Sequence, residues 1–246
     1  MSSPSYACYP KPSGHDLSMM FSAESLRLLL ITDDSGRSPA ELLRIVQAAI
    51  RGGVTGVQLR EKQASGQRVR ELVGELAALC QGAEVALFLN ASLLHHISEL
   101  PLSVGIHFGA ATWHLRNSYV SGARDTLRSI GYSAHEIAEA QQVAQEGAHY
   151  VTLSPIYDTP SKRGILEPRG PAWLELARRS LGEFPIVALG GIDGTNAREV
   201  VRAGADGIAV IRAIMAAPDP EIAARQLREQ VELGLRDRQN KLRQGT

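Results

Sequence analysis

From Leu26 onward, the chain alternates short apolar runs with longer segments in which apolar residues recur every three or four positions. The short runs have the length of buried strands, and Gly or polar residues bound them. We predict eight strands, at residues 28–32, 56–60, 85–90, 104–108, 129–133, 150–154, 186–190 and 207–211.

The intervening segments have the period of amphipathic helices. In segment 39–53, Leu42, Ile45 and Ala49 share one face, and Gly52 and Gly53 end the helix. Segments 137–150 and 196–207 repeat the same order of helix, Gly and new strand. Strict alternation of buried strands and helices favours a parallel sheet whose faces are covered. Eight such units predict a single α/β domain, a closed (β/α)₈ TIM barrel, rather than an open sheet.

Length and charge are consistent with this fold. A chain of 246 residues is typical of a one-domain barrel. Lys plus Arg and Asp plus Glu number 26 each, so no bulk positive field attracts nucleic acid or an anionic membrane. Cys8 and Cys80 lie far apart and show no metal-ligand spacing, so we expect free thiols and a cytoplasmic protein.

The two ends of the chain differ from the middle. Residues 1–24 lack the continuous apolar core of a signal peptide, and we expect them to form a disordered arm. The barrel is expected over residues 25–237, and a charged tail over residues 238–246. No apolar run near the start approaches the roughly 20 residues that cross a bilayer.

Polar side chains gather where the predicted strands end, which is where barrels of this class place their active sites. Gln58 and Arg60 alternate with Leu59, so both polar side chains should point into the barrel mouth. A buried arginine in the barrel mouth needs a partner of opposite charge, because burying an unpaired charge is costly. Glu61 is the structural alternative, but with Lys162 as a further cation, a phosphate or diphosphate ligand explains the cluster better.

A second anion contact is predicted after the last two strands. Gly190 and Gly191 lack side chains, so their backbone N–H groups can approach a phosphate closely. Ile211 and Arg212 follow the eighth strand and begin a helix beside them. A tight Gly-Gly turn without a ligand is the alternative.

Proton-transfer chemistry has one main candidate. Ser133 ends the fifth strand and His135 follows at the mouth, where an imidazole can move a proton near neutral pH. His107 ends the fourth strand and is either a second site residue or a packed one. The long sixth loop, of the kind that often clamps a ligand, adds further candidate contacts: Thr159, Ser161 and Lys162.

Together these residues resemble the thiamine phosphate synthase and TenI superfamily over roughly residues 26–235. The resemblance rests on six motifs in family order, VQLREK, GIHFG, GYSAH, SPIYDTPSK, ALGGI and AGADGIAVIRAI. It implies that an aminopyrimidine diphosphate would be bound by Gln58, Arg60, Lys62, Asn90, Ser133 and Lys162. It also implies that a thiazole phosphate would be held by Thr159, Ser161, Gly191, Ile211 and Arg212.

The chain departs from the synthases at two positions. The resemblance implies magnesium-binding carboxylates where this chain has Ala91 and Thr112. Mg²⁺ in proteins is usually held by one or two carboxylates, and Asp158 or Glu167 are the available replacements. We therefore expect no metal cofactor, and Mg²⁺ only if the chain is a synthase.

Two enzyme functions and one binding function follow. The TenI branch resembles these departures, because thiazole tautomerases aromatise a carboxythiazole phosphate by proton transfer without a metal. We place this reaction, with His135 and Lys162 as catalytic residues, slightly ahead of thiamine phosphate synthesis. The complete set of Gln58, Arg60 and Lys62 favours the synthase. A non-catalytic protein that binds thiazole or thiamine phosphate is the third alternative.

Overall fold

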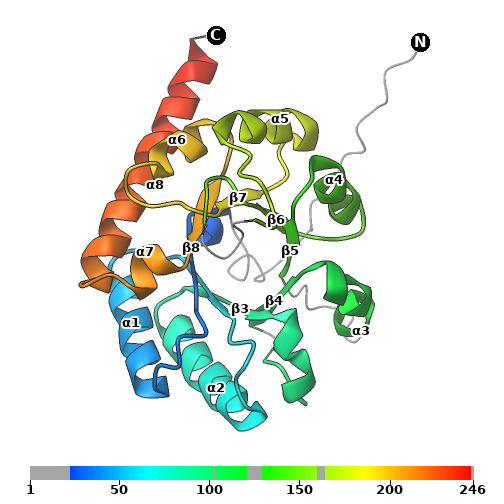
Figure 1. The fold of residues 1–246 in the computed structure, drawn as a ribbon, viewed down its shortest axis with the longest axis vertical. Helices are drawn as coiled ribbons and strands as arrows, with labels where there is room; N and C mark the ends of the chain where they lie inside the picture. Colours follow the sequence, from blue (N-terminus) through cyan, green and yellow to red (C-terminus); the bar gives the residue numbers. More distant parts are fainter. Residues whose placement is uncertain (1–22, 102, 121–128, 160–163, 245–246) are drawn as a thin grey trace, which may run out of the picture.

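The computed structural model describes residues 23–101, 103–120, 129–159 and 164–244. Eight parallel strands follow one another around a closed barrel, and the last strand pairs with the first. Figure 1 shows the barrel with a ring of helices around it. The predicted (β/α)₈ barrel is confirmed.

The strands match the predicted ranges to within one residue at each end. They are β1 (Leu28–Ile31), β2 (Gly56–Leu59), β3 (Ala86–Asn90), β4 (Val104–Phe108), β5 (Ile130–Ala134), β6 (Tyr150–Leu153), β7 (Ile186–Leu189) and β8 (Gly207–Val210). Their residues are buried almost throughout, as expected for a sheet covered on one side by helices and filled on the other by side chains.

The helices are not all alike, because the crossovers next to β3 and β4 contain short 3₁₀ segments. The α-helices are α1 (Pro39–Arg51), α2 (Gly66–Gly82), α3 (Arg116–Val120), α4 (Ile137–Gln145), α5 (Pro171–Leu181), α6 (Ala197–Arg202), α7 (Arg212–Met215) and α8 (Pro220–Arg243). The 3₁₀ segments are η1 (Ala23–Leu26), η2 (Ala91–His96) and η3 (Ala110–Leu115).

Helix α1 shows how local sequence sets these elements. Ser38 caps it by accepting a hydrogen bond from the Glu41 N–H. Leu42 and Ala49 are buried on the predicted face. The helix ends at Gly52, where a Cβ would lie 2.3 Å from the Glu221 carbonyl oxygen. Gly52 therefore lets α8 pack closely against α1, as Figure 1 shows.

Two aromatic rings fill the interior of the barrel. Phe88 and Tyr150 pack edge to face with ring centroids 5.3 Å apart. Gly131 makes room for Tyr150, since a Cβ there would lie 2.2 Å from the phenol Cζ. Tyr150 begins β6, so its ring enters from the end opposite the mouth. Together with Leu29 and Val187, the two rings belong to the apolar cluster that fills the barrel interior.

The structure revises the boundary expected at the carboxyl end of the chain. Helix α8 continues to Arg243, so residues 238–243 form its last turns rather than a separate tail. Arg238 fixes this part of the helix by donating to Asp206 at 3.0 Å. Nearly all of the predicted arm, including Cys8, lies outside the described residues. Cys80 is a buried free thiol. Among the helices that the structure describes, none is long and apolar enough to span a membrane.

Candidate active site

A cavity of about 1030 Å³ opens at the carboxyl ends of the strands. Most of the predicted site residues line it: Gln58, Arg60, Lys62, Asn90, His107, Ser133, His135, Thr159, Gly190, Gly191, Ile211 and Arg212. Ser161 and Lys162 lie outside the described residues. The barrel thus brings together residues that are up to 154 positions apart in the sequence, counting from Gln58 to Arg212.

Gln58 presents a buried amide with an unused donor. Its side chain is inside the barrel with the residue 1% exposed, while Leu59 packs into the core outside. Gln58 Oε1 accepts a bond from Asn90 Nδ2 at 3.4 Å, and Asn90 Oδ1 is held by Ser92. Gln58 Nε2 has no hydrogen-bond partner among the described residues. Because a buried unpaired donor is costly, this nitrogen indicates a place for a ligand acceptor.

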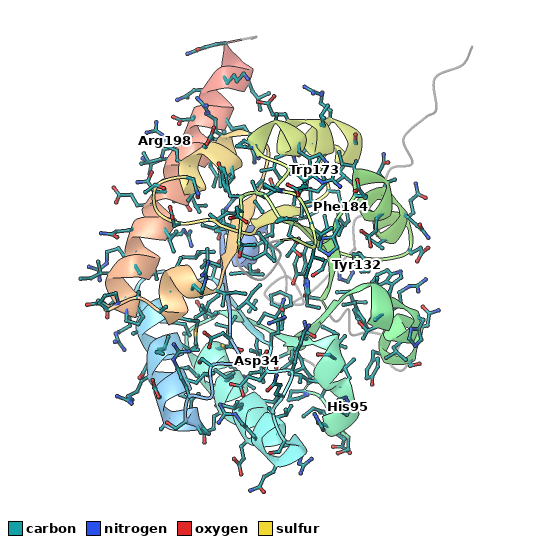
Figure 2. All side chains as sticks on the ribbon, in the orientation of Figure 1. Asp34, His95, Tyr132, Trp173, Phe184 and Arg198 are labelled. Carbon is teal, nitrogen blue, oxygen red and sulfur yellow. The ribbon has the colours of Figure 1, made fainter. Side chains whose placement is uncertain are left out.

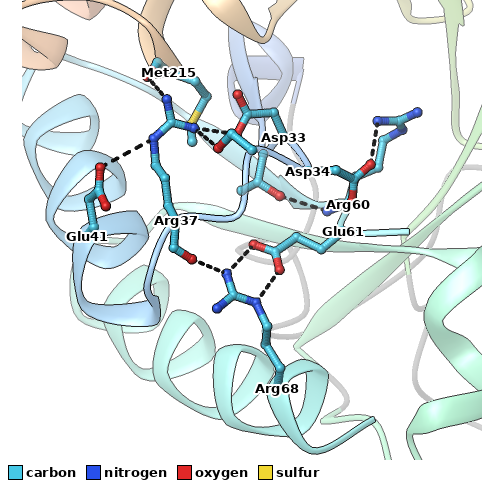
Figure 3. A network of polar contacts seen from close by, with 10 residues as sticks. Asp33, Asp34, Arg37, Glu41, Arg60, Glu61, Arg68 and Met215 are labelled. Carbon is cyan, nitrogen blue, oxygen red and sulfur yellow. Dashed lines mark hydrogen bonds and ion pairs between the residues drawn. The ribbon is translucent and has the colours of Figure 1, made fainter. Parts of the chain in front are cut away.

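Arg60 lies beside Gln58 and is only weakly paired. Its Nη1 is 3.9 Å from Asp34 Oδ2, and its side chain is 30% exposed. Glu61, the alternative partner, instead binds Arg68 with two hydrogen bonds of 2.6 and 3.0 Å (Figure 3). The guanidinium of Arg60 therefore keeps most of its charge available to an anion in the cavity.

A polar network holds the loop that carries Arg60 and Lys62. The hydrogen bonds that Arg68 donates to Glu61 raise the pKa of Arg68, whose Nη2 also donates to the Arg37 carbonyl at 2.7 Å. Arg37 in turn donates to Asp33 at 2.6 Å and to the Met215 carbonyl at 2.9 Å (Figure 3). These bonds connect the segments that follow β1, β2 and β8. The loop is therefore fixed before any ligand binds.

His107 lies on the cavity floor with both ring nitrogens engaged. Its Nε2 is 2.8 Å from Ser133 Oγ, and its Nδ1 is 3.0 Å from the Tyr150 hydroxyl. Burial lowers the pKa of His107 to about 3, so the ring is neutral at physiological pH. Thr152 Oγ1 also lies 3.3 Å from Ser133 Oγ. Sequence reasoning missed Tyr150 and Thr152, because both sit in an ordinary apolar strand pattern.

His135 is oriented by two backbone contacts. Its Nδ1 donates to the Ser154 carbonyl oxygen at 2.7 Å, since a carbonyl can only accept. The backbone N–H of His135 donates to the Glu139 carboxylate at 2.8 Å, and this carboxylate also accepts a hydrogen bond from the Tyr132 hydroxyl. In the neutral ring, this leaves Nε2 as an acceptor. His135 thus meets the geometric need of a general base at the mouth.

Gly190 and Gly191 form the opposite wall. Their φ angles are 104° and 64°, in the left-handed region that favours glycine. A Cβ on Gly191 would lie 2.6 Å from the Asp158 carbonyl oxygen, and one on Gly190 would lie 2.9 Å from Pro155 Cα. The sixth loop therefore packs directly against this turn. Ile211 and Arg212 line the cavity beside it.

The positions that would carry magnesium ligands do not fit that role. Ala91 is buried and has no donor atom, and the Thr112 hydroxyl is bonded to the backbone of Gly109. Asp158 lines the cavity, but Glu167 is exposed and is not among its lining residues. Within the described residues, no group of three or more His, Cys, Asp or Glu side chains could hold a metal ion.

Comparison with known proteins agrees with the motifs. Residues 28–214 match the family described as thiamine monophosphate synthase. Thiamine-phosphate synthase of Chloroflexus aurantiacus is 40% identical over 82% of this chain and 91% of its own length. Thiamine-phosphate synthase of Geobacillus kaustophilus is 36% identical over 81% of this chain and 88% of its own length. The solved structure of thiamine phosphate pyrophosphorylase from Pyrococcus furiosus has a TM-score of 0.73 at 28% identity, covering 87% of this chain and 98% of that chain.

Proposed function

The chain belongs to the thiamine monophosphate synthase family, within the thiamine phosphate synthase and TenI superfamily, and we propose that it is itself a thiamine phosphate synthase. It is an enzyme of thiamine biosynthesis. In the proposed reaction, an aminopyrimidine diphosphate and a thiazole phosphate combine to give thiamine phosphate and pyrophosphate. The sequence alone favoured tautomerisation slightly over synthesis. The similar proteins are named thiamine-phosphate synthases, which favours synthesis instead.

The observation that carries the proposal is the pair formed by Gln58 and Arg60. A buried amide donor, without a partner among the residues that the structure describes, and a weakly paired guanidinium lie side by side at the end of β2. Both suit an anionic ligand rich in acceptor oxygens, such as a diphosphate. A tautomerase has no diphosphate to hold, so it would not need this pair in addition to its phosphate site.

The two substrates would occupy opposite walls of the cavity. We assign the diphosphate to Gln58, Arg60, Lys62 and Asn90, with Ser133 between the walls. The thiazole phosphate is assigned to Thr159, Gly191, Ile211 and Arg212. The roles predicted for Ser161 and Lys162 stay predictions.

Charge development explains why cations belong on the diphosphate wall. The bond between the pyrimidine methylene carbon and the diphosphate oxygen breaks, and the thiazole nitrogen forms the new bond to that carbon. Pyrophosphate leaves with the electron pair, so positive groups around it stabilise the transition state. Arg60 and Lys62 can supply that charge directly. The sequence alone led us to expect Mg²⁺ in a synthase, but its ligands would fall at Ala91, which has no donor atom, and at Thr112, whose hydroxyl is bonded to Gly109. We therefore propose a synthase without a resident metal ion and without another cofactor.

Product formation tests the proposal. Purified protein is incubated with aminopyrimidine diphosphate and thiazole phosphate, and thiamine phosphate and pyrophosphate are quantified together. The expected result is equal formation of both products, which depends on the presence of both substrates. A protein that binds both substrates but forms neither product would refute the synthase and favour a binding protein.

Tautomerisation is the second candidate, and the orientation of His135 favours it. With Nδ1 donating to the Ser154 carbonyl oxygen, Nε2 of the neutral ring can take a proton from a non-aromatic carboxythiazole phosphate and return it elsewhere on the ring. Under this alternative, wild type should aromatise that substrate in EDTA. His135→Asn should then slow the reaction by roughly two to four orders of magnitude, the usual share of general acid–base catalysis. Aromatisation without thiamine phosphate synthesis would make this candidate the function.

A further inference from the structure

The cavity floor carries four hydrogen-bonding side chains in contact with one another. They run from Tyr150 through His107 to Ser133, with Thr152 beside Ser133. Tyr150, His107 and Thr152 are buried, whereas Ser133 is half-buried and lines the cavity. Ser133 is thus the member of this group that is most open to a ligand.

The chemistry of the groups sets the direction of these bonds. A neutral imidazole has one N–H donor and one lone-pair acceptor. The phenol of Tyr150 is a more acidic donor than a serine hydroxyl, and the imidazole lone pair is the strongest neutral acceptor in the group. The two distances fit either tautomer of the ring, and the strength of the imidazole acceptor favours the one in which Tyr150 donates to His107 Nδ1. The ring proton then lies on Nε2, which makes His107 a donor to Ser133.

The Ser133 hydroxyl has a limited set of remaining bonds. It offers two lone pairs and one proton. One lone pair accepts from His107 Nε2 at 2.8 Å, and Thr152 Oγ1 lies at 3.3 Å from the same oxygen. With its acceptor side turned toward these two donors, Ser133 has its own proton left to give. Because Ser133 lines the cavity, a ligand there can accept that proton in a hydrogen bond.

We propose that Tyr150 and His107 are positioning residues that fix the Ser133 hydroxyl as a donor to an acceptor atom of the bound aminopyrimidine diphosphate. The inference rests on the proposed function, because it assigns that substrate to the cavity. A freely rotating hydroxyl binds donors and acceptors alike, whereas a fixed donor discriminates against a ligand that presents a donor. The arrangement is set by the fold, since Gly131 leaves the space that the Tyr150 ring fills.

The tautomer of His107 is the first test, and it needs no substrate. Nitrogen-15 NMR of the free wild-type protein at pH 7 should show a neutral His107 with its proton on Nε2. Loss of the signals in His107→Asn assigns them. In Tyr150→Phe, which removes only the hydroxyl, the preference for this single tautomer should be lost. A wild-type ring protonated on Nδ1 would overturn the inference.

A double-mutant cycle is the second test. Tyr150→Phe should weaken binding of aminopyrimidine diphosphate by about 3- to 10-fold, the scale of one hydrogen bond. In a Ser133→Ala background, the same change should cost nothing further, because Tyr150 acts through Ser133. Thiazole phosphate affinity and the melting temperature serve as controls for the fold. An equal penalty in both backgrounds would show a purely structural role and refute the proposal.

Failure of the proposed function would look different. Wild type that binds aminopyrimidine diphosphate but makes no thiamine phosphate refutes the synthase, while the cycle still decides the role of Tyr150. Wild type that does not bind this compound at all overturns the proposed function and, with it, the ligand contact of Ser133.

Discussion

The two walls of the cavity are built from different parts of the chain. On the diphosphate wall, at the ends of β2 and β3, the groups facing the cavity are the side chains of Gln58, Arg60 and Asn90. On the opposite side, at the ends of β7 and β8, the central groups are the backbones of Gly190 and Gly191, and we call this side, to which we assign the thiazole phosphate, the phosphate wall. β3 and β7 lie four strands apart, on opposite sides of the eight-stranded barrel.

Because one wall is built from side chains and the other from backbone, the two walls should differ in how well they tolerate substitutions. A wall made of backbone depends on φ angles and close packing, so almost any substitution disturbs it. A wall made of side chains can lose one group and keep the rest. The positions expected to hold magnesium ligands, now Ala91 and Thr112, both lie next to the diphosphate wall. The comparison predicts that the two walls respond differently to mutation.

Removing a cation from the diphosphate wall should have the largest effect. Arg60→Ala should weaken pyrophosphate binding by about 1.5 to 3 kcal/mol, or roughly 10- to 150-fold, because it removes a charged hydrogen-bond donor. Thiazole phosphate affinity should be almost unchanged. Calorimetric titration of both ligands measures the contrast.

Arg198→Ala is the matched control for that experiment. Arg198 pairs with Asp237 on the surface and lies toward the rim in Figure 2, whereas Asp34, the neighbour of Arg60, lies nearer the barrel centre. It should leave both affinities intact. Equal loss of both ligands in Arg60→Ala would contradict the division into two walls.

A methyl group on the phosphate wall should act through the backbone. Gly191→Ala places a Cβ 2.6 Å from the Asp158 carbonyl oxygen at a φ of 64°. We expect a loss of about 1 to 3 kcal/mol of stability, the cost of a strained left-handed residue. Urea unfolding measures this. Gly194→Ala is the control, because no atom lies within 4 Å of its Cβ position; equal stability of the two variants would show that the turn is not constrained.

The buried His107 on the cavity floor should make the free energy of unfolding depend on pH. Burial holds the pKa of His107 near 3, well below the 6.5 of an unfolded histidine. The unfolded chain therefore binds more protons below pH 6.5, and stability must fall as the pH drops. From pH 6.5 to 5, this residue alone should remove roughly 1.5 kcal/mol. Burial shifts the pKa of His149 in the same direction. Unfolding curves that do not change over this interval would mean that His107 is not buried as a neutral ring.

Restoring carboxylates should have the smallest effect. The double variant Ala91→Asp, Thr112→Asp should let Mg²⁺ strengthen pyrophosphate binding by roughly two- to tenfold, the scale of one or two added polar contacts. Wild type should show no such gain over EDTA. An equal magnesium effect in wild type would mean that other residues supply the metal ligands.

Sequence patterns predicted the glycine turn at Gly190 and Gly191 more directly than the side-chain partners around Arg60, for a physical reason. Strand ends and glycine turns are local features, so the positions of Gly190 and Gly191 followed from the chain itself. Side-chain partners depend on distant packing. Adjacency alone offered Glu61 as the alternative partner of Arg60, and only the packing of α2, which brings Arg68 to Glu61, removes that alternative.

The cavity floor was the hardest part to predict. Tyr150 and His107 are 43 positions apart, and their hydrogen bond exists only because the barrel closes around them. Nothing in the strand pattern around Tyr150 distinguishes it from an ordinary core residue. Contacts of this kind follow from strand register and from the space left by Gly131, which a single sequence does not display.

The most direct test of the two-wall account is a crystal structure with both products bound. With thiamine phosphate and pyrophosphate in the cavity, we predict that pyrophosphate oxygens lie within hydrogen-bond distance of Gln58 Nε2 and the Arg60 guanidinium. The phosphate of thiamine phosphate should contact the backbone at Gly191 and Arg212. A structure in which pyrophosphate instead occupies the glycine turn, or in which Gln58 Nε2 stays without a partner, would contradict the account.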